Sequence, residues 1–194
     1  MRYDSEHKAK TRERVLKEAS AAIRLEGPDR VGVAAIMSRA GLTHGGFYAH
    51  FKSKDDLVAQ AIGHMFEDRY AAFFAHLDTS DPAAAVTAFV TGYLSMRHRD
   101  AIDRGCPIPV LAGEVPRMSP DARAIFVTAV RKLTEAVTQL LENLDIPDAN
   151  HRASSILSEM VGALALSRMH SDTAEAQALL DHSRRSILRA LGLD

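Results

Sequence analysis

Cysteine and tryptophan are almost missing from this chain: its 194 residues include one cysteine and no tryptophan. The single cysteine, Cys106, excludes a framework of internal disulfides. The sequence also has no run of about 18 consecutive apolar residues, so we expect no membrane-spanning helix. The N-terminus is charged and lacks the apolar segment of a secretion signal, which predicts a cytoplasmic protein.

Charge of either sign is not in large excess, because 24 Lys and Arg residues stand against 25 Asp and Glu residues. A net charge of −1 argues against a protein that binds nucleic acid through its overall field alone. The charge is nevertheless uneven: residues 1–60 carry 11 basic and 8 acidic side chains, and the remainder carries 13 and 17. A basic head on an acidic body favours DNA contact at one end of the chain.

Hydrophobic residues make up 46% of the chain and aromatic residues only 6%, which is typical of a helical protein with a real core. Apolar residues recur at helical spacing, and no convincing alternating pattern of a strand is present. Start signals for helices occur at Asp81-Pro82, Ser119-Pro120, Pro147 and Asp172. We therefore expect an all-α fold in which residues 1–57 and 58–194 form two domains.

Residues 41–57 carry the most specific pattern in the chain. Gly41 follows the last periodic residue of a short helix, where glycine can take the positive φ of a sharp turn. Thr43 offers a hydroxyl that can cap the next helix, and Ser53 offers another, with Asp56 three residues on. Helix, glycine turn and capped helix are typical of a helix-turn-helix DNA-binding unit. A supporting helix ending at Gly27-Pro28 should precede it, with a face of Val15, Ala19, Ala22 and Ile23.

The start of the second helix would enter the major groove of DNA. Thr43 and His44 are the side chains best placed to read bases, helped by Arg39 from the preceding helix. Gly45 and Gly46 disfavour a helix by about 1 kcal/mol each, so we interpret them as allowing close approach to the DNA backbone. Three further side chains can donate hydrogen bonds to phosphate oxygens: Tyr48, His50 and Lys54.

This stretch resembles the signature of the tetracycline-repressor (TetR) family of transcriptional regulators. The likeness covers about residues 10–60 and rests on fixed residue types at fixed spacing: Ala40-Gly41, Thr43, Gly45, Phe47-Tyr48-Ala49-His50-Phe51 and Ser53-Lys54-Asp55-Asp56-Leu57. The resemblance implies phosphate contacts by Tyr48, His50 and Lys54. It also implies that Thr43, His44 and Gly46 face the groove. Gly46 departs from the family, which often has Thr or Ser there, so one polar contact is missing.

The body of the chain predicts helices over residues 58–77, 82–98 and 119–144, which would enclose an interior. Met and aromatic side chains on such helices can line an adaptable apolar site, although these stripes are more often plain core. The expected ligand is a small-molecule inducer of unknown identity. The candidate ligand-binding residues are Phe66, Tyr70, Phe73, Phe89, Tyr93, Met96, Cys106, Phe126 and Met160.

Two further helices, over residues 148–169 and 173–191, carry apolar stripes and small residues at the C-terminal end. The resemblance implies that this pair forms a four-helix interface in a homodimer. The alternative is that both stripes face the core of their own subunit. The candidate interface residues are Leu157, Val161, Leu164, Leu180 and Ile187.

The segment 104–109 interrupts the helices, and Cys106 could begin a short helix there. Backbone amides and Arg104 would then lower the pKa of the thiol and favour a reactive thiolate. The alternative is a buried, inert cysteine. An enzyme would need a base beside this thiol, and only His98 or His76 could supply it. No spacing of His or Cys predicts a metal site, and no motif predicts a cofactor.

Together these patterns predict a DNA-binding regulator, and the resemblance implies a homodimeric repressor. Two recognition helices about 34–36 Å apart, or a multiple of that distance, would bind a palindromic operator in double-stranded DNA. A small molecule in the body, or modification of Cys106, would shift the two heads and release the operator. The competing class is a helical enzyme or thiol sensor that acts through Cys106 without DNA.

Overall fold

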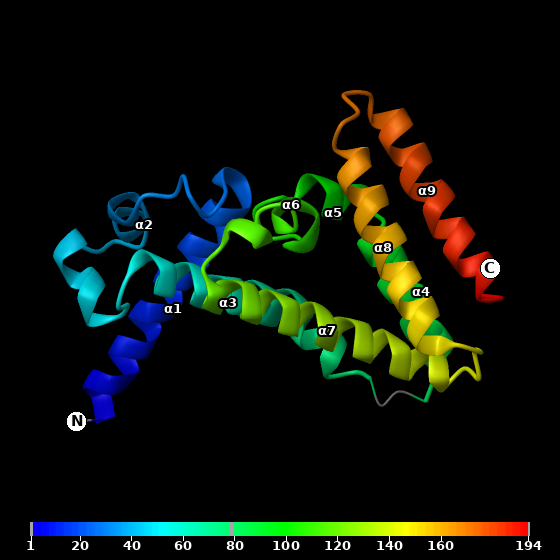
Figure 1. Cartoon of the computed structure of the whole chain (residues 1–194), viewed down its shortest axis with the longest axis horizontal. Coiled ribbons are helices and arrows are strands. Elements are labelled where there is room, and N and C mark those ends of the chain that lie inside the picture. The colour runs from blue at the N-terminus through cyan, green and yellow to red at the C-terminus, as the bar shows by residue number, and fades with distance from the viewer. Residues whose placement is uncertain (1, 78–79, 194) are drawn as a thin grey trace.

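The computed structural model describes residues 2–77 and 80–193. This part of the chain folds into α-helices and two 3-10 helices and contains no strand, so the expected all-α fold is confirmed. The N-terminal helices lie at one end of an elongated molecule and the C-terminal pair at the other (Figure 1). None of the helices in these two stretches combines the length and hydrophobicity needed to cross a bilayer.

The N-terminal head consists of α1 (Arg2–Glu26), α2 (Val33–Arg39) and the 3-10 helix η1 (His44–Ala49). Helix α1 ends where expected, because Gly27 follows it with a φ of +85°. The predicted face of α1 is buried against α2 and α3 (Lys54–Phe74). The buried residues of that face are Val15, Ala19, Ala22 and Ile23.

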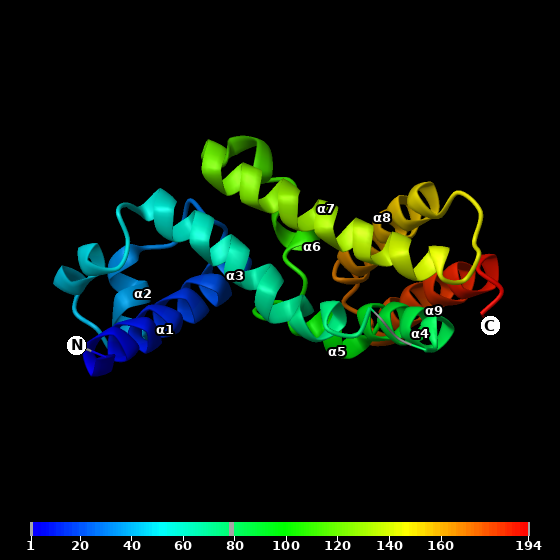
Figure 2. The same cartoon turned by 90° about the horizontal axis from the view of Figure 1, so that it is seen from below.

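Helix α3 connects the head to the body. It packs on α1 at its N-terminal end and beside α7 (Pro120–Glu142) along its length, as Figure 2 shows. The predicted cap is confirmed, since Ser53 Oγ accepts a hydrogen bond from the Asp56 amide at 3.1 Å. The Asp56 carboxylate reaches back to the Lys52 amide at 2.8 Å, one residue before the cap.

The expected helix over residues 82–98 is broken. Helix α4 (Pro82–Tyr93) starts at the predicted Asp81 cap and ends before Leu94, and α5 (Met96–Asp100) begins after a new cap at Ser95. The chain then passes through α6 (Ile108–Leu111) and the 3-10 helix η2 (Val115–Arg117) before α7. A Ser-x-x-His cap inside an apolar run gave too weak a stop signal for the sequence to predict this break.

The C-terminal pair, α8 (Ala149–Ser167) and α9 (Thr173–Ala190), packs side by side (Figure 1). Asp172 caps α9 as expected, through the Ala174 amide at 2.7 Å. Pro147 does not begin α8, because Asp148 after it adopts a left-handed φ of +53° and the helix starts only at Ala149.

Gly105 is the glycine on which the chain packs most tightly. A Cβ atom there would lie 2.8 Å from the Ala101 carbonyl oxygen and 3.0 Å from the His98 ring. Gly105→Ala should therefore lower the free energy of unfolding by about 1–3 kcal/mol, measured by urea titration. Gly113→Ala is the matched control, because a Cβ there meets nothing within 4 Å. Equal stability of the two variants would contradict the packing described here.

Candidate DNA-binding and ligand sites

The turn between α2 and η1 has the geometry that the sequence predicts. Gly41 adopts a φ of +71°, and the Leu42 amide donates to the Met37 carbonyl at 2.9 Å, which closes the end of α2. Phe47 and Phe51 are each 2% exposed and stack with ring centroids 5.6 Å apart. These two rings fix η1 on the head, so the residues between and before them face outward.

The expected recognition α-helix is instead the six-residue 3-10 helix η1. Gly45 and Gly46 explain the difference, since two adjacent glycines weaken an α-helix and tolerate a tighter winding. Thr43 occupies the cap position, but its hydroxyl makes no capping hydrogen bond, contrary to expectation. Its side chain therefore stays available for a contact outside the protein.

The predicted base-reading residues lie together on one exposed surface. Thr43, His44 and Gly45 are exposed, and Gly46 is half-buried, with room for a Cβ 3.8 Å from the Met37 side chain. Arg39 is also exposed, and its guanidinium contacts Glu26 at 3.4 Å. An exposed ion pair of this kind is weak, so Arg39 can exchange its partner.

The three predicted phosphate donors differ in their surroundings. Tyr48 is 73% exposed, and its ring forms a T-shaped pair with that of Phe47, with the centroids 5.2 Å apart. His50 is half-buried and its Nδ1 atom has no hydrogen-bond partner within the described residues. Burial, and then the nearby cations Lys8 and Arg12, lower the pKa of His50, so the neutral ring is favoured. It can contact a phosphate as a hydrogen-bond donor.

Lys54 already holds a partner inside the head. Its Nζ atom donates to the Asp29 carbonyl oxygen at 2.7 Å, which ties the start of α3 to the connection before α2. An ammonium group has three donors, so this hydrogen bond leaves two for a phosphate. The lysine thus both positions the turn and stays able to contact DNA.

Four of the nine predicted ligand residues gather around one hollow of about 290 Å³ between α3 and α4. Phe73 and Phe89 stack there with centroids 4.3 Å apart, and both are half-buried. Tyr70 and Tyr93 complete the aromatic wall, and Arg69 and Arg97 lie at its edge. The size of the hollow is at the lower end of the range typical for small-molecule sites.

The other predicted ligand residues do not line this hollow. Phe66 borders a separate groove of about 450 Å³ between α3 and α7, whose lining combines small and apolar residues with the charged Glu67 and Lys132. Phe126 packs edge-on against Phe66 at 5.3 Å and is buried, as is Met160. Met96 is half-buried and packs on the core. For Phe126 and Met160 the plain core interpretation fits this arrangement.

Cys106 is buried, with 1% of its surface exposed, and it precedes α6 rather than starting it. Of the two alternatives for this residue, the reactive thiolate with a lowered pKa is wrong and the buried cysteine is correct, because burial raises the pKa of the thiol. Arg104 is exposed and its guanidinium points to Asp103 at 4.0 Å, so it does not activate the sulfur. The neutral, protected thiol is therefore the favoured form.

His98 lies beside Cys106 but is no free base. Its Nε2 atom accepts from the Cys106 amide at 2.8 Å, so its Nδ1–H must donate to the Tyr93 carbonyl at 2.8 Å. Burial lowers the pKa of His98 to about 4, which keeps this neutral tautomer. Both ring nitrogens hold the backbone, and no three His, Cys, Asp or Glu side chains in residues 2–77 and 80–193 gather as metal ligands.

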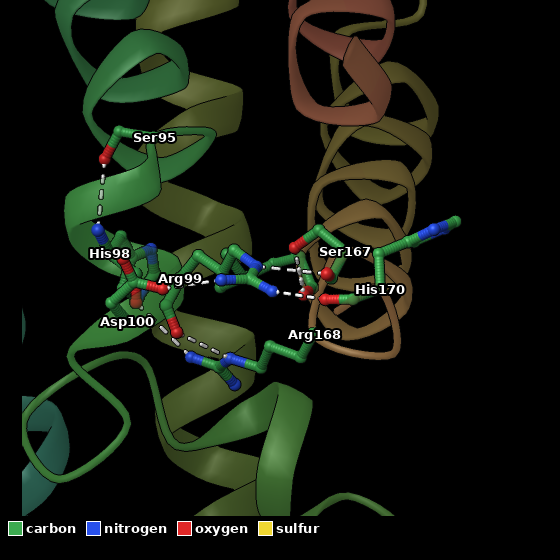
Figure 3. A network of polar contacts seen from close by, with 8 residues as sticks. Ser95, His98, Arg99, Asp100, Ser167, Arg168 and His170 are labelled. Carbon is green, nitrogen blue, oxygen red and sulfur yellow. Dashed lines mark hydrogen bonds and ion pairs between the residues drawn. The ribbon is translucent and has the colours of Figure 1, made fainter. Parts of the chain in front are cut away.

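Two arginines clamp α5 to the end of α8 (Figure 3). Arg99 donates from Nε to the Ser167 carbonyl at 3.0 Å and from Nη2 to the His170 carbonyl at 2.7 Å. Arg168 returns the contact, donating from Nε to the Arg99 carbonyl at 3.0 Å. Each arginine thus caps the carbonyl end of the other's helix, a role that the charged run in the sequence did not reveal.

Arg24 of α1 makes the corresponding contact between head and body. It is 5% exposed, and its guanidinium donates to the Asp103 and Met65 carbonyls, each at 3.3 Å. Arg24 is not among the residues that the sequence patterns predicted to be functional. A signal was available, because Leu16, Ser20 and Arg24 follow one another at i, i+4 and i+8 along a buried stripe.

The predicted dimer residues are mostly covered by their own subunit. Leu157, Leu164, Leu180 and Ile187 are all buried in the single chain, and Val161 is half-buried. An adjoining stripe of α8 is more open: Leu166 is 52% exposed and Met169, just beyond the helix, 79%. Gly162, Ala165, Leu166 and Met169 follow helical spacing, so they lie on one face.

The geometry of His98 predicts a stability loss in acid. Its pKa of about 4 in the folded protein lies below the ordinary value of 6.5, so the unfolded chain binds the proton more readily. Stability should be full above about pH 6.5 and fall by up to about 3 kcal/mol as the pH approaches 4. Urea unfolding at pH 7 and pH 4.5 measures this change. His98→Gln should lose the part of the pH dependence that is due to the imidazole, and an unchanged difference between the two pH values would contradict this assignment.

Comparisons with known proteins agree on both parts of the chain. Residues 15–61 match the N-terminal domain of bacterial regulatory proteins of the tetR family, and residues 82–182 match the C-terminal domain of LmrA/YxaF-like transcriptional regulators. The uncharacterized HTH-type transcriptional regulator YxaF of Bacillus subtilis (strain 168) is 26% identical over 167 residues. That alignment covers 84% of this chain and 87% of YxaF.

Solved structures share the fold. A TetR transcriptional regulator from Chloroflexus aurantiacus J-10-FL superposes with a TM-score of 0.82 and 25% identity, over 96% of both chains. The reduced form of E. coli NemR superposes with a TM-score of 0.81 over 93% of this chain and 97% of NemR, and at 18% identity it supports the fold alone. Since the C-terminal match by itself spans more than half of the chain, the protein belongs to the tetR family of bacterial DNA-binding transcriptional regulators.

Proposed function

We propose that the protein is a repressor that binds a palindromic operator as a homodimer and leaves it when a small molecule binds the body. The observation that carries the proposal is the surface of η1. Buried Phe47 and Phe51 hold it rigidly, while Thr43, His44 and Tyr48 remain exposed beside each other. Such a function places the protein in the cytoplasm with the DNA.

Few side chains are available to read bases, because two of the residues at the start of η1 are glycines. We assign base contacts to Thr43 and His44, with Arg39 in support, and backbone contacts to Tyr48, His50 and Lys54. The glycines let the head approach the phosphates closely, since a Cβ at Gly45 would meet nothing within the protein. Affinity then rests on a small number of placed contacts and not on a strong field.

The domain division that we propose is a DNA-binding head over residues 1–57 and a ligand-binding body over residues 58–194. Helix α3 crosses this boundary without a break. A movement of the body therefore turns the head, and the hydrogen bonds of Arg24 to both α3 and the segment after α5 link the same two parts. Ligand binding against these elements would change the spacing of two heads on DNA.

The dimer contact that we propose uses α8 and α9, with the open stripe of Gly162, Ala165, Leu166 and Met169 at its centre. Small residues allow two helices to approach closely, and exposed leucine and methionine supply apolar area. The buried residues named above then support this face from within. A helical enzyme acting through Cys106 is less well supported, because both nitrogens of His98 hold backbone groups.

Removal of the exposed phenol at the head tests DNA recognition. Selection from random duplexes would supply the operator, and fluorescence anisotropy would measure its affinity. Tyr48→Phe should weaken binding about tenfold, because a hydrogen bond to a charged group contributes about 1.5–3 kcal/mol. Lys54→Gln should reduce the slope of log affinity against log salt by about one. Val127→Ala, an exposed control on α7, should change neither quantity. Operator affinity that is unchanged in both head variants would exclude this surface.

A charge on the open stripe of α8 tests the dimer. Leu166→Asp should shift the protein from dimer to monomer in sedimentation, since a carboxylate would be buried without a partner. Its thermal unfolding should show a folded monomer, because Leu166 is half-exposed within the chain. Val127→Asp, with a similar exposure of 57%, should remain dimeric. A dimeric Leu166→Asp variant would place the interface elsewhere.

A further inference from the structure

The hollow between α3 and α4 continues into a second one of about 380 Å³ between α4, α5 and the segment after it. Arg69, Gly92 and Arg97 border both, so the two hollows adjoin, and together they are here named the Arg69 site. Its first part is aromatic, through the stacked pair Phe73 and Phe89. Its second part is basic, because Arg104 joins the two shared arginines.

The cations of the Arg69 site are poorly matched by anions. Among the side chains that the structure describes, neither Arg69 nor Arg97 forms an ion pair with a carboxylate, and Arg104 reaches Asp103 only at 4.0 Å. Asp100 pairs with Arg99 at 2.7 Å, and neither Asp68 nor Asp103 lies within ion-pair distance of Arg69 or Arg97 in the described part of the chain. The site therefore presents two unneutralised guanidinium groups beside an apolar surface.

Hydrogen-bond donors are also in excess around the site. Tyr70 and Tyr93 form part of the wall of the site, and each residue is 1% exposed. Their hydroxyls have no hydrogen-bond partner of normal geometry in the described part of the chain. Both hydroxyls face the buried Cys106 thiol, a weak partner. Arg24 Nε and Arg168 Nη1 are buried and have no hydrogen-bond partner among the described residues either. Neither Cys106 nor these two arginines line the hollows, so the two arginines contribute positive charge from behind the site and no direct contact to a bound molecule.

The local potential is positive for the same reason. Besides burial, the charges of Arg69, Arg168 and Arg24 lower the pKa of His98, which lines the basic part of the site. Arg168 also contacts this residue directly, since its Nη2 atom donates to the His98 carbonyl at 3.4 Å. An anion that enters here exchanges water for several fixed cations and donors, which favours it strongly over a neutral molecule of the same shape.

We propose that the Arg69 site binds an aromatic carboxylic acid, with its ring on Phe73 and Phe89 and its carboxylate between Arg69 and Arg97. Planar guanidinium groups suit a carboxylate, and the flat aromatic pair with small neighbours suits a ring. The inference rests on the proposed function, since this acid would be the inducer. The acid would contact Ala101 and Gly105 in the segment after α5. The same segment contains Asp103, whose carbonyl accepts a hydrogen bond from Arg24 of α1.

Calorimetric titration of the full-length protein separates charge from shape. The matched probes are 2-naphthoate and its uncharged analogue 2-naphthamide, each at low and high salt. We expect 2-naphthoate to bind at least tenfold more tightly than the amide, with a preference that shrinks as salt rises. Equal affinities for the two probes, or no saturable binding of the acid, would overturn the proposal.

Arginine variants locate the binding. The double variant Arg69→Gln, Arg97→Gln should lose at least tenfold in 2-naphthoate affinity and keep its affinity for 2-naphthamide. Arg131→Gln, in an exposed pair with Glu135 on α7, should stay within twofold of the wild type, and unfolding curves would verify that each variant is folded. A double variant that binds the acid as the wild type does would place the site elsewhere and overturn the proposal.

Operator binding in the presence of 2-naphthoate then separates this inference from the proposed function. Loss of operator affinity in the wild type but not in the double variant supports both. Tight, arginine-dependent binding of the acid with unchanged operator affinity supports the ligand class and contradicts its role as inducer. Release of the operator by the acid in the double variant as in the wild type would retain a regulator but exclude the Arg69 site.

Discussion

The break between α4 and α5 is the constraint on which the rest of the body depends. A helix that stops in a protein interior leaves carbonyl and amide groups without partners, and each such group costs about 1–3 kcal/mol if it stays unsatisfied. His98 satisfies the Tyr93 carbonyl and the Cys106 amide together. Arg168 satisfies the carbonyl at Arg99. Side chains therefore replace the hydrogen bonds that a continuous helix would have made.

These side-chain hydrogen bonds tie distant elements to α5 and to the short segment that follows it. Arg99 of α5 in turn caps the end of α8. Helix α5 therefore cannot move without disturbing the helix that carries the proposed dimer face. Arg24 of the head holds the segment after α5, because its guanidinium donates to the carbonyl of Asp103. Because packed and hydrogen-bonded elements shift between discrete arrangements, a change at this point can reach both ends of the molecule.

Local chemistry explains which features could be predicted from the sequence. Gly27, Gly41 and the caps at Ser53 and Asp81 depend on neighbours within four residues, and the structure has all of them as expected. The order of helix, glycine turn and helix in the head was predictable for the same reason, whereas the 3-10 winding of η1 and the missing Thr43 cap were not predicted.

Long-range contacts explain what the sequence analysis missed. Whether a charged run is solvated or buried depends on the groups that other helices bring to it, and no periodicity within residues 97–100 reveals that Ser167 lies opposite. The sequence left a reactive and a buried Cys106 as alternatives for the same reason, since the burial of the thiol results from the packing of Tyr70 and Tyr93 around it. The burial of Arg24 was visible in its stripe, but its carbonyl partners were not.

Unsatisfied donors beside an aromatic hollow have a consequence for switching. A ligand shifts an equilibrium only by the difference between its affinities for the two states. If a bound acid draws Arg69 and Arg97 together, the arrangement that brings both guanidinium groups closest to its carboxylate gains the most. Without an anion the two like charges repel each other, so the proposed ligand would remodel this part of the body by neutralising them. The same charge would make the site selective, because a neutral aromatic molecule would fill the hollow and leave both arginines without an anion.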